Sequence, residues 1–181
     1  MKAIGLVELK SIPVGIQTAD EMLKAAEVDI VMASPVCPGK YIIIVTGDVA
    51  AVKSSVGAGE AKGDIFIIEA SVIPNIHDDV CPAITATSDF GNIDALGGIE
   101  SMSALESIVA GDIIAKAAQV SLIEIRIARG LGGKSFVLFT GDTASVSQSL
   151  EACLRELGDN GYITSTMLIP NPHPNLIPFL V

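Results

Sequence analysis

The sequence predicts an α+β protein built from two tandem copies of a ferredoxin-like domain, each with the element order βαββαβ. Two observations support this prediction. The chain repeats itself, because residues 4–8 return at 96–100 and residues 20–26 return at 112–118, both 92 positions later. Short β-rich runs also alternate with segments of helical periodicity in the same order in both halves. We therefore expect a first domain over residues 1–80, a linker over 81–94 and a second domain over 95–181.

The first copy opens with an alternating apolar strand, followed by a helix whose apolar positions recur every three or four residues. These positions predict the helix face that packs on the sheet: Ile12, Ile16, Ala19, Leu23 and Ala26. A second helix is expected to begin after Asp48, a plausible N-cap. The four predicted strands cover residues 3–9, 29–33, 41–46 and 65–73.

An irregular loop is predicted at residues 34–39, because two prolines and a glycine are incompatible with regular structure there. The second copy carries a glycine-rich loop at the matching place, over residues 128–133. Its expected strands cover 96–100, 121–127, 134–140 and 162–169, and its expected helices cover 104–118 and 145–157.

Composition excludes several classes of function. A net charge of −10 without a basic stripe argues against nucleic-acid binding. No apolar run approaches the roughly 18 residues of a membrane-spanning helix, and no secretory leader is recognisable, so we expect a cytoplasmic protein without a membrane partner. Three cysteines, an odd number, favour a reducing compartment. Half of the residues are hydrophobic, and this surplus is expected to face partner subunits.

No catalytic constellation is present in the sequence. It has no Gly-x-Ser-x-Gly, no Cys–His–Asp set and no phosphate-binding loop. Glu8 and Glu100 occupy the same position in the two copies, and we do not expect them to act as an acid–base pair. The sequence therefore predicts a protein that is not an enzyme.

Several linked motifs resemble those of bacterial microcompartment shell proteins. They are Gly-Asp at 47–48 and 141–142, and the strand ends Ile-Pro-Asn-Ile-His at 73–77 and Ile-Pro-Asn-Pro-His at 169–173. The resemblance covers essentially the whole chain, twice over. It implies a homotrimer that mimics a hexamer, a pseudohexamer, and that tiles with other microcompartment shell proteins into a cytoplasmic microcompartment shell.

The run Cys37-Pro38-Gly39-Lys40 resembles the propanediol-utilisation tandem type of this family. That resemblance implies one [4Fe–4S] cluster per trimer, held at a central pore by Cys37 of each chain. The cluster would carry electrons across the shell or be delivered to redox enzymes, so encapsulated redox enzymes or an external electron donor are further expected partners. The implied pore loops consist of Ser34, Pro35, Val36, Cys37, Pro38 and Gly39 in the first copy and Arg129, Gly130, Leu131 and Gly132 in the second.

The residues themselves leave alternatives open for Cys37. A cysteine followed by proline is typical of iron–sulfur ligands, whereas a lone cysteine is commonly a small buried hydrophobe. The pore could also pass metabolites without a cluster, or the chain could be a ferredoxin-like regulatory module that binds a small ligand. Such a module would be a monomer or dimer. Cys81 and Cys153 are expected to be structural.

The resemblance also implies residues at the edges where neighbouring assemblies meet: Lys24, Lys116, Asn75, His77, Asn171 and His173. Both lysines sit at the same position of their helices, where a merely solvated role is the alternative. Relatives that form hexamers usually carry arginine where this chain has Asn75 and Asn171, which affects the expected strength or pattern of lateral tiling.

Overall fold

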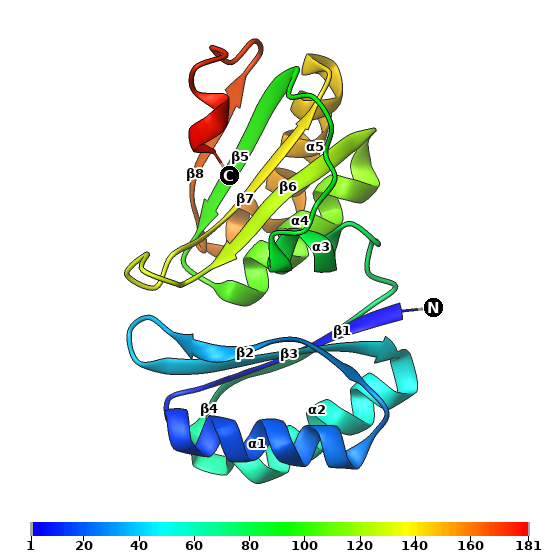
Figure 1. Cartoon of the computed structure of the whole chain (residues 1–181), viewed down its shortest axis with the longest axis vertical. Helices are drawn as coiled ribbons and strands as arrows, with labels where there is room; N and C mark the ends of the chain where they lie inside the picture. The colour runs from blue at the N-terminus through cyan, green and yellow to red at the C-terminus, as the bar shows by residue number, and fades with distance from the viewer. Residues whose placement is uncertain (1, 181) are drawn as a thin grey trace. The chain divides into compact units, whose positions relative to one another are not determined.

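The computed structural model describes residues 2–180, which form two compact units that divide between Ile76 and His77. The first unit has the predicted order βαββαβ (Figure 1). Its elements are β1 (Lys2–Leu9), α1 (Ile12–Ala25), β2 (Asp29–Val36), β3 (Lys40–Asp48), α2 (Val49–Gly63), a short 3₁₀ turn (Asp64–Phe66) and β4 (Ile67–Pro74).

The first sheet has the strand order β2-β3-β1-β4, and all neighbouring strands are antiparallel. Both helices cover the same face of this sheet (Figure 1). This is the split arrangement of ferredoxin-like folds, in which each helix connects strands that are not neighbours. The predicted fold class is confirmed for this unit.

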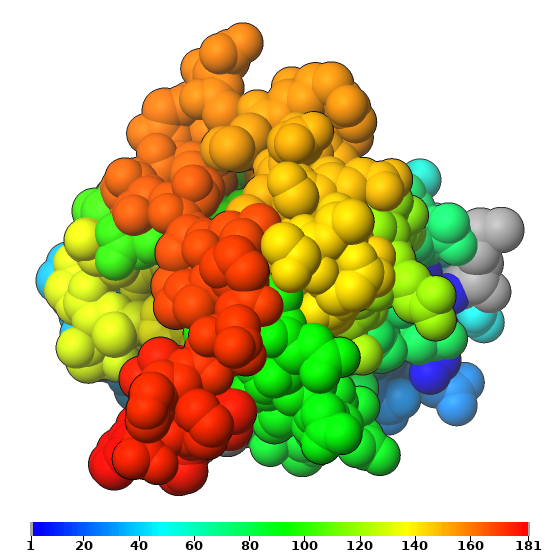
Figure 2. All heavy atoms as spheres, turned by 90° about the horizontal axis from the view of Figure 1, so that it is seen from above, coloured from blue at the N-terminus to red at the C-terminus, as the bar shows by residue number. Residues whose placement is uncertain are grey.

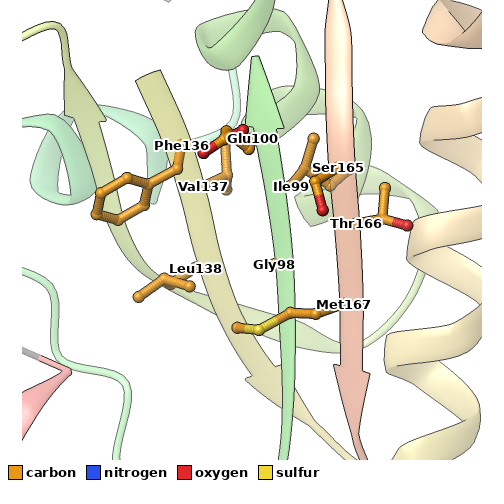
Figure 3. Close-up of a pocket in the computed structure, with 9 residues that line it drawn as sticks. All are labelled: Gly98, Ile99, Glu100, Phe136, Val137, Leu138, Ser165, Thr166 and Met167. Atoms are coloured by element: carbon orange, nitrogen blue, oxygen red, sulfur yellow. The ribbon is translucent and has the colours of Figure 1, made fainter. Parts of the chain in front are cut away.

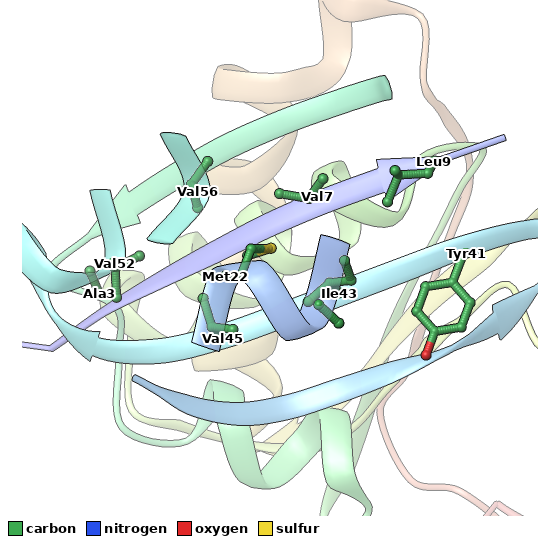
Figure 4. Packing of buried hydrophobic residues seen from close by; sticks show 10 residues of the cluster. Ala3, Val7, Leu9, Met22, Tyr41, Ile43, Val45, Val52 and Val56 are labelled. Atoms are coloured by element: carbon green, nitrogen blue, oxygen red, sulfur yellow. The ribbon is translucent and has the colours of Figure 1, made fainter. Parts of the chain in front are cut away.

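The core of the first unit lies between the sheet and the two helices (Figure 4). Met22 of α1 and Val52 of α2 are fully buried against β-strand side chains such as Val7 and Ile43. Gly5 allows α2 to approach the sheet, because a Cβ there would lie 2.6 Å from a methyl group of Val56. Burying apolar area in this way is the main stabilising contribution to the unit.

The predicted apolar face of the first helix is only partly covered in this unit. The side of α1 that packs on the sheet consists of Gly15, Thr18, Ala19 and Met22. Ile16 and Leu23 are exposed, whereas Ala19 is buried and Ile12 packs against the core while partly buried. The helix therefore has two neighbouring stripes. The sheet covers the one that contains Ala19 and Met22, and it leaves Ile16 and Leu23 uncovered.

The structure also corrects the prediction that residues 34–39 are irregular throughout. Strand β2 continues through Ser34, Pro35 and Val36, and Pro35 pairs in register with Tyr41 of β3. A proline is tolerated there because β2 is an edge strand, where alternate backbone N–H groups have no neighbouring strand to bond.

The second unit repeats the fold, with sheet order β6-β7-β5-β8 and all neighbours antiparallel. Its elements are β5 (Ala95–Ser101), α4 (Ala104–Ala117), β6 (Val120–Ile127), β7 (Ser135–Gly141), α5 (Thr143–Leu157) and β8 (Ile163–Ile169), with 3₁₀ turns at Gly158–Asn160 and Ile177–Phe179. The irregularity within β2, between Ile30 and Met32, recurs in β6 between Leu122 and Glu124. The repeat thus extends to the details of strand register.

The segment predicted as a linker contains a helix. Helix α3 (Val80–Thr85) packs against β6 and α4 and belongs to the second unit. Val80, Ala83 and Ile84 bury their side chains, which accounts for a helix in a stretch with few sequence signals. Among residues 2–180, no helix is both long enough and apolar enough to cross a bilayer.

Candidate functional site

The first predicted pore loop is a tight hairpin turn between β2 and β3 (Figure 1). Cys37, Pro38 and Gly39 form the turn, and the backbone N–H of Gly39 donates to the carbonyl of Val36 at 3.0 Å. The Cys37–Pro38 peptide bond is cis, and Gly39 has φ +86°, a conformation that favours glycine. Cys37 is partly exposed at this tip, so its thiol can be reached from outside the chain.

An ion pair holds the base of this turn. The ammonium of Lys40 donates to the carboxylate of Glu8 at 3.2 Å, and Glu8 is buried on β1. The pair joins the residue after the turn to the neighbouring strand. It therefore fixes the start of β3 directly beside Cys37.

The second predicted pore loop is longer and flexible in composition. Ala128 and three glycines, Gly130, Gly132 and Gly133, adopt positive φ angles, and the N–H of Lys134 donates to the carbonyl of Leu131 at 3.1 Å. Arg129 and Gly130 are exposed. The loop presents backbone groups and one guanidinium but no thiol, as the sequence predicts.

The same ion pair recurs at the base of the second loop. Lys134 donates to Glu100 at 2.8 Å, and the hydroxyl of Thr164 donates to the same carboxylate at 2.5 Å. The hydrogen bond from Lys134, with that from Thr164, lowers the pKa of Glu100. Glu8 and Glu100 are thus structural partners of lysines. The sequence indicated the glutamates as a matched pair but not their partners, which lie more than 30 positions further along the chain.

The two other cysteines lie away from the loops. Cys153 is fully buried in α5, and burial raises the pKa of its thiol to about 12. Cys81 lies on α3. Within residues 2–180 of one chain, no group of three or more His, Cys, Asp or Glu side chains is placed to hold a metal ion. A metal group at Cys37 therefore requires thiolates from several chains.

If several chains contribute their Cys37 thiolates, these thiolates fit the ligand requirement of an iron–sulfur cluster. Thiolates are the usual ligands of such clusters, and a partly exposed cysteine followed by proline on a short hairpin can present its sulfur outward. The turn is anchored by the Lys40–Glu8 pair, so several copies would present their thiols in the same conformation. The second loop has no thiolate to supply to such a centre.

Two of the predicted edge residues, His77 and Lys116, both bind the carboxylate of Asp112. In the second unit, Asp112 of α4 accepts a hydrogen bond from the backbone N–H of His77 at 2.8 Å and pairs with Lys116 at 2.6 Å. Asp112 is buried, which shields its hydrogen bond with His77 from water, whereas Lys116 is partly exposed. In the first unit, Lys24 forms the corresponding ion pair with the exposed Asp20, and this hydrogen bond raises the pKa of Lys24.

The remaining predicted edge residues lie in turns that follow the last strand of each copy. Asn75 is exposed with φ +56°, a conformation that asparagine tolerates better than most residues. Asn171 and His173 are exposed, and the ring nitrogen Nδ1 of His173 accepts the N–H of Asn175 at 3.2 Å. The assignment of these residues to an assembly edge stays a prediction.

An open apolar hollow lies on the helix-free face of the second sheet, and sequence reasoning missed it. It has a volume of about 290 Å³, and Figure 3 shows Leu138 and Met167 near Gly98, with Phe136 nearer to Glu100. Glu100, the partner of Lys134, also lines it. The signal in the sequence was Gly98, which stands where the first copy has Leu6. A hollow of this kind is suited to contact with another apolar surface.

Comparison with known proteins identifies the family. The family model described as the BMC domain matches residues 3–76 and again residues 95–172. The chain belongs to the BMC domain family. It is a tandem-domain member, and the resemblance to microcompartment shell proteins predicted from the motifs is confirmed.

Individual relatives agree with this assignment. The chain is 33% identical over 175 residues to the bacterial microcompartment shell protein PduT of Citrobacter freundii, covering 97% of this chain and 95% of that protein. The chain is also similar to PduA of Salmonella typhimurium, likewise named a microcompartment shell protein, at 39% identity over 83 residues, which are 44% of this chain and 86% of PduA. The structural role of these relatives is consistent with the prediction that the chain is not an enzyme.

A solved structure matches the whole chain. The crystal structure of a microcompartment protein from Desulfitobacterium hafniense superposes with a TM-score of 0.96 at 49% identity, covering 98% of this chain and 99% of that one. The tandem fold described above is therefore shared by a protein of known structure.

Proposed function

We propose that three copies of this chain form a pseudohexameric ring that tiles into a microcompartment shell and holds one [4Fe–4S] cluster through Cys37 of each chain. Two similar domains per chain give six similar domain positions in a closed ring of three chains. Cys37 occurs in only one of the two loops, so this ring offers three thiolates around its axis.

One observation carries the cluster proposal. Cys37 is a partly exposed thiol at the tip of a short hairpin whose base is held by an ion pair, whereas Cys153 is sealed in the core. Within this ring, Cys37 holds the cluster, Gly39 allows the turn, and the Lys40–Glu8 pair keeps the turn in one orientation. When bound, the cluster supplies one-electron redox chemistry, with a fourth iron left to a ligand other than cysteine.

The proposal gives the chain a role in passing electrons across the shell or in delivering a cluster to enclosed redox enzymes. Other shell proteins are its expected lateral partners, because relatives such as PduT and PduA are themselves named shell proteins. An external electron donor is the expected partner on the other side of the pore.

Two variants test the ligand assignment. Cys37→Ser should remove bound iron and sulfide while leaving the mass of the assembly unchanged, because the turn contributes little to the core. Cys81→Ser is the matched control and should keep the iron. Iron that persists in Cys37→Ser overturns the assignment. Wild-type protein that binds no iron after anaerobic reconstitution supports the alternative of a metabolite pore or a purely structural tile.

A further inference from the structure

The two units differ in one stripe of their first helices. In α4 this stripe, the α4 strip, consists of Ala104, Ile108, Asp112 and Ala115, all of which are buried. The repeat-equivalent α1 strip consists of Ile12, Ile16, Asp20 and Leu23. There Ile16 is 55% exposed and Leu23 is 42% exposed, and Asp20 lies open to solvent. The neighbouring edge strands show the same contrast, since Leu122 is buried in β6 and its equivalent Ile30 is 44% exposed in β2.

Residues 77–84, the covering segment, lie along the α4 strip in the second unit. The backbone N–H of His77 donates to Asp112 at 2.8 Å, which fixes the start of the segment on the strip. Helix α3 then packs against β6 and α4, with Val80, Ala83 and Ile84 buried. The segment follows the last strand of the first repeat in sequence but belongs to the second unit.

The C-terminal segment, residues 173–180, repeats the covering segment 96 positions later. It makes the same turn: the N–H of Asp79 donates to His77 Nδ1 at 3.3 Å, and the N–H of Asn175 donates to His173 Nδ1 at 3.2 Å. In each segment the backbone N–H three residues after the histidine donates to the histidine carbonyl. The distances are 3.1 Å from Val80 and 2.8 Å from Leu176.

The apolar side chains of the C-terminal segment are exposed, whereas the equivalent side chains of the covering segment are buried. Val80 and Ala83 are fully buried, whereas their equivalents Leu176 and Phe179 are 40% and 85% exposed. Figure 2 shows this segment in red as a lobe at the rim of the surface seen in that view. Leu176 and Phe179 are therefore two exposed apolar side chains on one segment, and exposed aromatic side chains of this kind are typical of contact surfaces.

We propose that the C-terminal segment of one chain docks on the α1 strip of a second copy, in the way that the covering segment docks on the α4 strip within the chain. Each chain then has one docking segment and one open strip, which produces a head-to-tail contact that can close into a ring. The backbone N–H of His173 would donate to the Asp20 carboxylate, as that of His77 does to Asp112. Leu176 and Phe179 would cover Ile16 and Leu23.

This inference rests on the proposed trimer and specifies one of its contacts. It also gives a function to the apolar periodicity of α1, because the exposed positions Ile16 and Leu23 are those that the sequence marked as a buried face. In this proposal, the two exposed positions of the predicted apolar face are buried by a second chain.

Photo-crosslinking tests the contact directly. Phe179 is replaced by p-benzoylphenylalanine, which keeps an aromatic side chain, and assemblies are formed from a mixture of ¹⁴N- and ¹⁵N-labelled chains. We expect crosslinked peptides that join position 179 to residues 12–23 or to β2, with one light and one heavy partner. Crosslinks confined to a single chain, or to other surfaces, overturn the proposal.

The mass of the assembly separates this inference from the trimer itself. Wild-type protein should have a mass of about 56 kDa, three times the 18.7 kDa chain. Phe179→Asp should raise the protein concentration at which the trimer half-dissociates by about 100-fold or more, as expected when a buried aromatic anchor is lost. Ile65→Asp, a control at another exposed apolar residue, should leave that concentration unchanged.

The outcomes are distinct. A trimer that persists unchanged in Phe179→Asp overturns the docking inference and leaves the proposed trimer intact. A wild-type mass of 18.7 kDa at all concentrations overturns both.

Discussion

Replacing Asp112 with alanine measures how firmly residues 77–84 are held on the second unit. The carboxylate accepts the His77 N–H at 2.8 Å and pairs with Lys116 at 2.6 Å. A hydrogen bond to a buried charged group contributes about 1.5–3 kcal/mol, and the pair with the more exposed Lys116 adds at most about 0.5 kcal/mol after screening. We expect the free energy of unfolding to fall by about 2 kcal/mol. At a urea dependence of about 2 kcal/mol per molar, the unfolding midpoint should fall by about 1 M.

Urea unfolding at fixed protein concentration, followed by circular dichroism, gives the midpoint, and hydrogen exchange of residues 77–86 gives the local effect. The amides of α3 should exchange faster in Asp112→Ala, because the segment loses its anchor at His77. Asp159→Ala, at an exposed acidic residue, is the control and should change neither measurement. A midpoint shift under about 0.2 M together with unchanged α3 exchange would show that Asp112 does not anchor this segment.

Two further predictions concern the core thiol and the edge lysines. Because burial raises the pKa of Cys153 from 9.0 to about 12, the unfolded chain loses this proton in a pH window in which the folded chain keeps it. The free energy of unfolding should therefore fall as pH rises from 9 towards 12. In Cys153→Ala it should fall less steeply over this window than in the wild type. Parallel pH profiles would contradict a raised thiol pKa at Cys153. Lys24→Ala combined with Lys116→Ala should weaken the assembly of trimers into sheets, seen by electron microscopy, without changing the trimer mass. Sheets that form as in the wild type would remove both lysines from the edge.

The element order of the fold could be predicted from the sequence because the two copies support each other. The sequence of β5 is too short to indicate a strand by itself, but its match to the sequence of β1 identifies it as one. The cap positions Asp48 and Asp142 were marked by the Gly-Asp repeat, and both precede helices in the structure. Asp142 caps its helix by accepting the N–H of Ser145.

The face of α1 could not be predicted because periodicity does not state which surface covers an apolar stripe. Gly15 lies against the Tyr41 ring, where a Cβ would come within 2.5 Å, so the sheet packs on the stripe that contains this glycine and Met22 and leaves Ile16 and Leu23 exposed. Helix α3 was missed for a related reason. Its stability comes from burial of Val80 and Ile84 on β6 and α4, not from local signals.

The candidate site could be predicted in part. Cys37 lies in a turn because Pro38 and Gly39 follow it, and the structure places it at a partly exposed tip. The ion pairs Glu8–Lys40 and Glu100–Lys134 join residues distant in sequence, so only their recurrence in both copies could have indicated them. The bond between His77 and Asp112 links a turn to a helix 35 positions away and has no local pattern.

An electron paramagnetic resonance spectrum of anaerobically purified protein, before and after reduction with dithionite, tests the central claim most directly. Iron, sulfide and spins are counted against the number of chains in the same sample. We expect a reduced-cluster signal of about one cluster per three chains, because each chain contributes one thiolate. A sample that stays silent and contains neither iron nor sulfide after anaerobic reconstitution would contradict it.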